Sequence, residues 1–116
     1  MKFERWSIWL ADLNPVVGSE QGKTRPVLII SENQINELLS VVNVLPLTSR
    51  KNDRNIYPNE ALLPSKHSGL KKESIALCYQ IRTLDKKRLI KSYGKLKDES
   101  LQKEVIAALS FQLGIE

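Results

Sequence analysis

Short apolar runs separated by turn-forming residues dominate the pattern along most of the chain. Runs of this kind, rich in β-branched and aromatic residues, are typical of strands. Four of them predict strands, at Trp6–Leu10, Pro26–Ile30, Val41–Thr48 and Ser74–Ile81. The second run is apolar along its whole length, so we expect both faces of that strand to be buried.

Helical spacing of apolar residues occurs in two places. Ser31–Leu39 predicts a short helical turn. The clearer helix follows Asp98, whose side chain can cap a helix N-terminus, and Gly114 can end it. The apolar face expected for this helix consists of Leu101, Val105, Ala108, Leu109, Gln112 and Leu113.

Two long polar segments separate the expected strands. Asn14–Thr24 predicts a loop, and loops of this length are often functional. Arg50–Ser74 is the least regular stretch, with one short strand expected near Asn55–Tyr57. A short basic turn is expected at Asp85–Arg88.

Several short strands with one terminal helix predict a mainly β fold with a C-terminal helix. The expected architecture is a compact, mostly antiparallel barrel or curled sheet that the helix covers on one side. The chain has 116 residues, a usual size for one domain, so residues 1–116 are expected to form a single unit.

Composition narrows the chemistry that is open to the chain. Asp12 breaks the first apolar stretch, and no uncharged run is longer than the twelve residues of Leu38–Ser49, which include Ser40–Ser49. We therefore expect no signal peptide, no membrane span and a cytoplasmic protein.

The chain has one cysteine, Cys78, and one histidine, His67. These counts argue against a disulfide, a zinc site and a ribonuclease that uses a pair of histidines. No metal or other cofactor is expected.

The formal net charge is +5. Residues 82–97 contain seven Lys or Arg and one acid, Asp85. Such a segment suits a polyanionic partner, although a surface that is exposed only to solvent can have the same charge pattern.

Four motifs in order carry a resemblance to a known family. They are Trp9–Gln21, Thr24–Val27, Pro46–Ser49 and Gln80–Lys86. Together they resemble the MazF/PemK toxins, and the resemblance extends from about Trp6 to Gly114. Each motif is weak alone, but the ordered set with these intervals is specific.

The resemblance implies a small SH3-like barrel of the MazF/PemK/CcdB type that forms a homodimer. It implies a toxin of a type II toxin-antitoxin system, an endoribonuclease that cuts single-stranded mRNA at short motifs without metal. A cognate antitoxin with an acidic tail is the implied protein partner. The family's catalytic arginine and threonine correspond to Arg25 and Thr48.

These residue types suit cleavage by the RNA's own 2′-hydroxyl. The planar guanidinium of Arg25 can hold two phosphate oxygens, and the Thr48 hydroxyl can donate one more hydrogen bond to the phosphorane. An arginine is almost always protonated, so Arg25 is a poor general base. Glu20, in the Asn14–Thr24 loop, is the candidate to accept the 2′-proton.

Base and phosphate recognition is expected from polar residues near these motifs. The candidate RNA-binding residues are Ser19, Gln21, Ser49, Ser74, Gln80, Arg82 and Lys86. Family members often carry an acidic residue before the Gln-Ile-Arg-Thr motif, where this chain has Tyr79. A ring that can stack replaces a charged acceptor there, so the resemblance leaves the cleavage motif open.

Alternative interpretations follow from the same residues. Arg25 could merely cap a strand entry, and Trp6 and Trp9 are expected in the core or a dimer contact rather than under RNA bases. At the level of function, one rival is a non-enzymatic toxin of the same fold that poisons a protein target such as gyrase. A second rival is an SH3-like RNA-binding module without activity.

Overall fold

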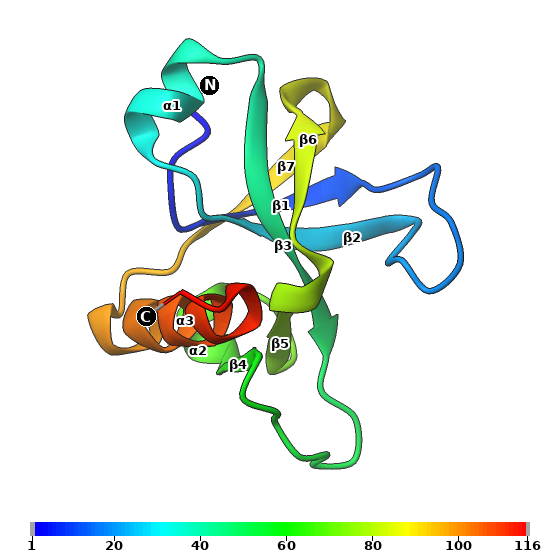
Figure 1. Ribbon diagram of the computed structural model, residues 1–116, viewed down its shortest axis with the longest axis vertical. Helices are drawn as coiled ribbons and strands as arrows, with labels where there is room; N and C mark the ends of the chain where they lie inside the picture. Colours follow the sequence, from blue (N-terminus) through cyan, green and yellow to red (C-terminus); the bar gives the residue numbers. More distant parts are fainter. Residues whose placement is uncertain (1, 116) are drawn as a thin grey trace.

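The computed structural model describes residues 2–115 and shows a curled sheet of seven strands with a helix packed against one end (Figure 1). All strand pairs are antiparallel, in the order β4-β5-β3-β2-β1-β7, and β6 also pairs with β3. The strands are β1 (Ser7–Asp12), β2 (Thr24–Ile29), β3 (Val41–Ser49), β4 (Glu60–Leu63), β5 (Ser74–Leu77), β6 (Arg82–Asp85) and β7 (Leu89–Lys95). The helical segments are α1 (Asn33–Leu38), α2 (Ser65–Ser68), η1 (Cys78–Gln80), η2 (Lys86–Arg88) and α3 (Glu99–Leu113).

Strand β2 lies between two apolar clusters. Leu28 packs into one of them, with Trp6, and its neighbours Val27 and Ile29 pack into the other, with Trp9. These three β2 residues are fully buried, which confirms the expectation from the uninterrupted apolar run. Trp6 and Trp9 are buried as well, as core residues.

Helix α3 covers the β4 and β5 end of the sheet (Figure 1). Asp98 caps it by accepting a hydrogen bond from the Leu101 N–H at 3.0 Å, and Gly114 ends it in the left-handed conformation at φ 69°. Both terminal signals are thus confirmed. The predicted apolar face is partly wrong, because Gln112 and Leu113 are exposed and the helix leaves the core after Leu109.

Two other expectations are corrected by the structure. The short strand expected near Asn55–Tyr57 is absent from this part of the chain, and the strand of this region is β4. A turn replaces it, closed by the Glu60 N–H donating to the Tyr57 carbonyl at 2.9 Å. The strand expected over Ser74–Ile81 ends at Leu77, because η1 interrupts it.

The interruption has a geometric cause. Leu47 of β3 pairs with Ala76 of β5, and Val44 of β3 pairs with Arg82 of β6. Three steps along β3 therefore face six steps along the opposite chain. The extra residues, Cys78–Gln80, are taken up in the 3₁₀ turn η1, which turns Tyr79 outward.

The helices of residues 2–115 include none that is both long enough and apolar enough to cross a membrane.

Candidate active site

Arg25 and Thr48 lie at the ends of two neighbouring strands. The antiparallel ladder of β2 and β3 ends with the pair Val27 and Pro46, and Arg25 and Thr48 each lie two residues beyond that pair. Both side chains line one pocket of about 280 Å³. The pocket is lined by Arg25, Pro26, Leu47, Thr48, Ser49, Leu70, Lys71, Lys72 and Ser74.

Arg25 is held by the loop that precedes it. Its Nε donates a hydrogen bond to the Gly22 carbonyl at 3.1 Å, and the side chain is half-buried. No salt bridge within residues 2–115 involves Arg25. The Nη groups, which would bind a phosphate bidentately, are therefore not engaged by a carboxylate.

The lining of this pocket carries cations and hydroxyls without any acid. Arg25, Lys71 and Lys72 supply positive charge, and Ser49 and Ser74 add hydroxyls to that of Thr48. Such a set attracts and hydrogen-bonds a phosphodiester. Ser49 and Ser74 were expected here from the sequence, whereas the lysine pair, Lys71 and Lys72, was not. The sequence places the two lysines just before an expected strand, but it does not show that this strand pairs with Thr48.

Glu20 lies in the loop between β1 and β2, outside the lining of this pocket. Its Oε1 accepts a hydrogen bond from the Val17 N–H at 2.6 Å, so the carboxylate closes a turn of its own loop. Its role as a proton acceptor stays a prediction, and in this conformation the carboxylate is directed to the loop backbone.

Ser19 and Gln21 are held through Gln80. The Gln80 Nε2 donates to the Ser19 carbonyl at 3.1 Å, and its Oε1 accepts from the Gln21 N–H at 3.2 Å. The side-chain oxygen of Gln21 is buried without a hydrogen-bond partner among the described residues. The structure thus brings these three predicted residues together, two in the β1–β2 loop that precedes Arg25 and the third, Gln80, against it.

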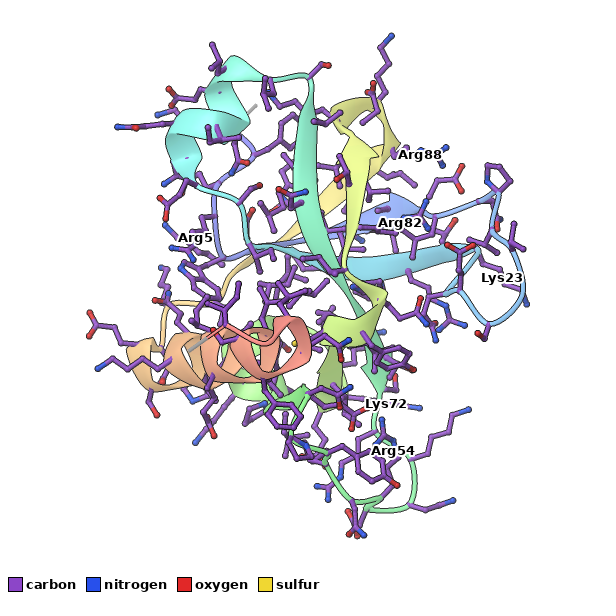
Figure 2. The ribbon with its side chains drawn as sticks, in the orientation of Figure 1. Arg5, Lys23, Arg54, Lys72, Arg82 and Arg88 are labelled. Atoms are coloured by element: carbon purple, nitrogen blue, oxygen red, sulfur yellow. The ribbon has the colours of Figure 1, made fainter. Side chains whose placement is uncertain are left out.

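Arg82 supports the same loop from the β6 side. Its Nη1 donates to the Leu13 carbonyl at 3.0 Å, and Arg88 donates to the carbonyls of Asp12 and Asn14. Both arginines lie beside the β1–β2 loop (Figure 2). The Arg82 guanidinium is therefore partly engaged with protein backbone.

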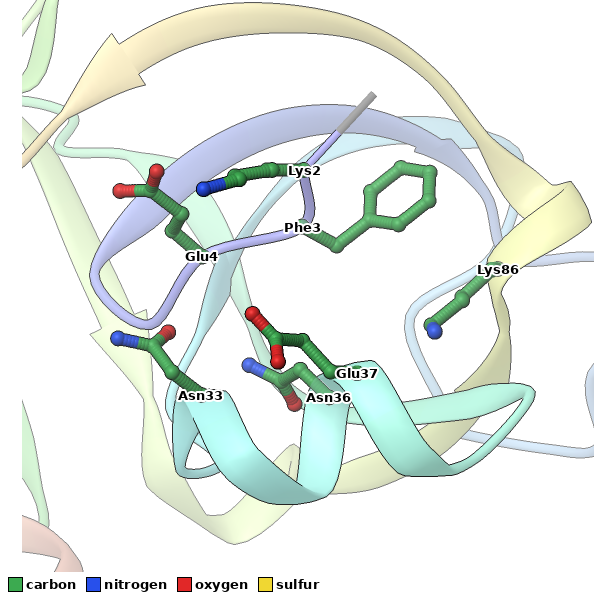
Figure 3. Close-up of a pocket in the computed structure, with 7 residues that line it drawn as sticks. All are labelled: Lys2, Phe3, Glu4, Asn33, Asn36, Glu37 and Lys86. Carbon is green, nitrogen blue, oxygen red and sulfur yellow. The ribbon is translucent and has the colours of Figure 1, made fainter.

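Lys86 lies away from the Arg25 pocket. It follows β6, whose last residue pairs with the first residue of β3, whereas Thr48 is near the other end of β3. Its Nζ lies 5.9 Å from the Phe3 ring centroid and lines a separate pocket between the N-terminal segment and α1 (Figure 3). The structure does not bring Lys86 together with the other predicted site residues.

Tyr79 is half-exposed and lines a third hollow, with Tyr57 and Phe111. That hollow also contains the ion pair between Arg54 and Glu60, whose Nη2 and Oε2 atoms are 2.9 Å apart. The neighbours of Tyr79 are thus different from those of Gln80, although the two residues are adjacent in the chain.

Comparison with known proteins identifies the family. Residues 4–113 match the family described as the PemK-like, MazF-like toxin of type II toxin-antitoxin systems. The chain belongs to this PemK/MazF family. A curated Endoribonuclease MazF from Staphylococcus saprophyticus is 42% identical over 111 residues, which cover 96% of this chain and 91% of that protein.

Solved MazF structures share the fold. MazF from Deinococcus radiodurans matches with a TM-score of 0.82 and 25% identity over 99% of both chains. The MazE-MazF structure from the same organism matches with a TM-score of 0.73 and 26% identity, over 97% of this chain and 96% of that chain. The mainly β fold with a C-terminal helix, predicted from the pattern and the resemblance, is confirmed.

These likenesses assign the chain to the endoribonucleases of toxin-antitoxin systems. They do not support the alternative of a gyrase-poisoning toxin, because the MazF relatives are named as endoribonucleases.

Proposed function

We propose that this PemK/MazF toxin cleaves single-stranded RNA at short sequence motifs, without a metal, in the pocket of Arg25 and Thr48. The observation that carries the proposal is that Arg25, which has no carboxylate partner within residues 2–115, and the Thr48 hydroxyl share one pocket whose lining contains no acid. A phosphodiester is the substrate group that fits this combination of charge and donors.

In the proposed reaction the 2′-oxygen attacks the adjacent phosphorus and the bond from phosphorus to the 5′-oxygen breaks. The products are a 2′,3′-cyclic phosphate and a 5′-hydroxyl. Arg25 and the Thr48 hydroxyl donate to the oxygens of the phosphorane, where negative charge accumulates. The 2′-hydroxyl loses one proton and the leaving 5′-oxygen gains one, so the site needs an acceptor and a donor.

Glu20 is the proposed acceptor of the 2′-proton. Its carboxylate now binds the Val17 N–H, and the β1–β2 loop would have to turn that group toward the pocket when RNA enters. Arg25 is the proposed donor to the leaving oxygen. DNA lacks the nucleophilic hydroxyl, and a duplex holds it poorly for in-line attack, so single-stranded RNA follows as the substrate.

Recognition of bases is proposed for the polar residues around the pocket. Ser49 and Ser74 lie in its wall, and Gln80 fixes the backbone next to Ser19 and Gln21. The buried side-chain oxygen of Gln21 has no partner within residues 2–115, and it could accept from a base amino group once the β1–β2 loop moves to admit RNA.

Partners are proposed by analogy with the relatives. Structures of a mycobacterial endoribonuclease with its cognate antitoxin and of MazE-MazF are among the structural neighbours. We extend this to the present chain, which would act as a homodimer in the cytoplasm and be inhibited by an antitoxin with an acidic segment. The net charge of +5 suits that segment as it suits RNA.

The decisive experiment sequences the 5′ ends that the purified chain produces from a mixed RNA pool in the presence of a chelator. We expect 5′-hydroxyl ends at one short motif, and loss of these ends with Arg25→Ala. Arg25→Lys keeps the charge without the planar fork and should remain strongly impaired. Intact RNA with the wild type, or full activity with Arg25→Ala, would contradict the proposal.

A further inference from the structure

Lys71 and Lys72 are fixed next to the Arg25 pocket by the pairing of β5 with β3. Ser74 pairs with Ser49, and the ladder continues through the Arg50 N–H, which donates to the Glu73 carbonyl at 3.0 Å. The last bond of this ladder is made by Glu73, and the lysine pair consists of the two residues directly before it. Figure 2 shows Lys72 near the end of β3.

The charge of this lysine pair is not neutralised by the nearest acid in the chain. Glu73 is engaged by Arg50, whose Nη1 lies 3.2 Å from Oε1 of the carboxylate. No salt bridge within residues 2–115 involves Lys71 or Lys72, and both side chains are exposed. Two free ammonium groups therefore border the pocket wall formed by Ser74.

Arg25 and the lysine pair occupy different sides of the pocket. The strands that carry the wall lie in the order β2, β3, β5, and neighbouring strands are about 4.8 Å apart. The backbones of Arg25 and of the β5 side are therefore about 10 Å apart, which is more than the length of about 3 Å that a single hydrogen bond spans. Arg25 and the lysine pair thus start from different walls of the pocket. The loop that contains Ser19–Gln21 leads into β2, and Gln80 of η1 holds it in place.

We propose that Lys71 and Lys72 form a second phosphate-binding site that holds a phosphodiester next to the scissile one. The inference rests on the proposed cleavage at Arg25 and Thr48. The RNA backbone would cross the strand ends from β2 to β5, with the scissile phosphate at Arg25 and Thr48 and the neighbouring phosphate at the lysines. Bases on the other side would meet the Ser19–Gln21 loop.

The test measures equilibrium binding of a non-cleavable, 2′-O-methylated RNA that contains the cleavage motif, over a series of salt concentrations. For the double variant Lys71→Gln/Lys72→Gln we expect binding about tenfold weaker at moderate salt. The slope of log affinity against log salt should become shallower by about 0.7, the value for one lost contact to a single-stranded phosphate. Lys97→Gln/Lys103→Gln is the matched control, because it removes the same charge from a position just before α3 and from α3 itself. This control should leave the slope unchanged.

A second arm replaces single phosphates of the RNA by uncharged methylphosphonates. One linkage beside the cleavage site should weaken wild-type binding about tenfold and have little effect on the double variant, since the contact is already lost. Equal slopes for the double variant and the control would overturn the proposal. So would a double variant that binds RNA normally but loses affinity for polyglutamate, since the lysines would then serve an acidic peptide. Binding is measured without cleavage, so loss of the lysine contact is distinguished from loss of the cleavage reaction.

Discussion

The side-chain oxygen of Gln80 accepts a hydrogen bond from the backbone N–H of Gln21, 59 residues earlier in the chain, at 3.2 Å. The Nε2 of the same amide donates to the Ser19 carbonyl, so Gln80 forms hydrogen bonds with the loop on both sides of Glu20. The next carbonyl after Gln21, that of Gly22, receives the Arg25 Nε. A hydrogen-bonded path therefore connects Gln80, in η1, to the arginine of the candidate active site.

Replacing Gln80 is expected to loosen this loop and reduce RNA cleavage. Gln80→Ala removes both bonds, and we expect kcat/KM to fall about tenfold because Arg25 and Glu20 are less well positioned. Gln80→Glu keeps the acceptor for Gln21 and loses the donor to Ser19, so its effect should be intermediate. Hydrogen exchange of the Gln21 amide, measured by NMR, reports the loop directly.

Faster exchange of the Gln21 amide in Gln80→Ala, with unchanged exchange in core strand β2, would identify a positioning role. If that amide exchanged at the wild-type rate, Gln80 would not hold the loop, whatever the activity.

The ion pair of Glu60 with Arg54 predicts acid-sensitive stability. The Glu60 side chain is 5% exposed, and Arg54, together with the Tyr57 N–H at 3.0 Å, lowers the pKa of its carboxyl below the usual 4.5. The folded state therefore binds the proton less readily than the unfolded chain. The stability that this group contributes is complete above about pH 4.5 and is lost as pH falls through the folded pKa.

Urea unfolding at a series of pH values tests this dependence. We expect Glu60→Gln to be less stable than wild type by about 2 kcal/mol at pH 7, with the difference shrinking toward pH 3. Glu73→Gln removes the more exposed pair with Arg50, and should cost less than about 1 kcal/mol. A constant difference for Glu60→Gln at all pH values would contradict the assignment.

Much of this fold was predictable because local signals and tertiary packing agree. The apolar run of β2 is buried on both faces, and the cap of Asp98 starts α3 where the pattern places it. Strand β4 was missed because it begins with Glu60. This carboxylate can be buried because the guanidinium of Arg54 forms an ion pair with it. That compensation is not visible in a local window of sequence.

The candidate site was predicted in part for a similar reason. The family motifs identify Arg25 and Thr48, and the fold brings both to the lining of one pocket. The lysine pair lies outside those motifs, and only the pairing of Ser74 with Ser49 brings it to the pocket. Lys86 was grouped with the site because its segment is basic, but charge along the chain does not tell which end of β3 a residue reaches.

Cys78 is expected to be unreactive in the folded protein. It is fully buried in η1, and burial together with the charge of Glu60 raises the pKa of its thiol to about 11. Little thiolate is present at pH 8, and reagents cannot reach it. Iodoacetamide should therefore label Cys78 much faster in concentrated urea than in buffer, as measured by mass spectrometry, and equal rates would show that this core opens readily.

The contribution of the Thr48 hydroxyl can be measured separately from that of the side-chain shape. Thr48→Val keeps the β-branched form at a position where β3 pairs with Ile75 of β5, and Thr48→Ser keeps the hydroxyl and loses the methyl group. If the hydroxyl donates to the phosphorane, Thr48→Val should reduce the single-turnover cleavage rate by about 10²–10³, the usual effect of losing one transition-state donor. Thr48→Ser should retain most of the rate. Binding of 2′-O-methylated RNA should change little in either variant, because the donor matters most when charge builds up on the phosphorane. A Thr48→Val enzyme that cleaves as fast as Thr48→Ser would remove Thr48 from the chemistry and leave Arg25 to stabilise the transition state alone.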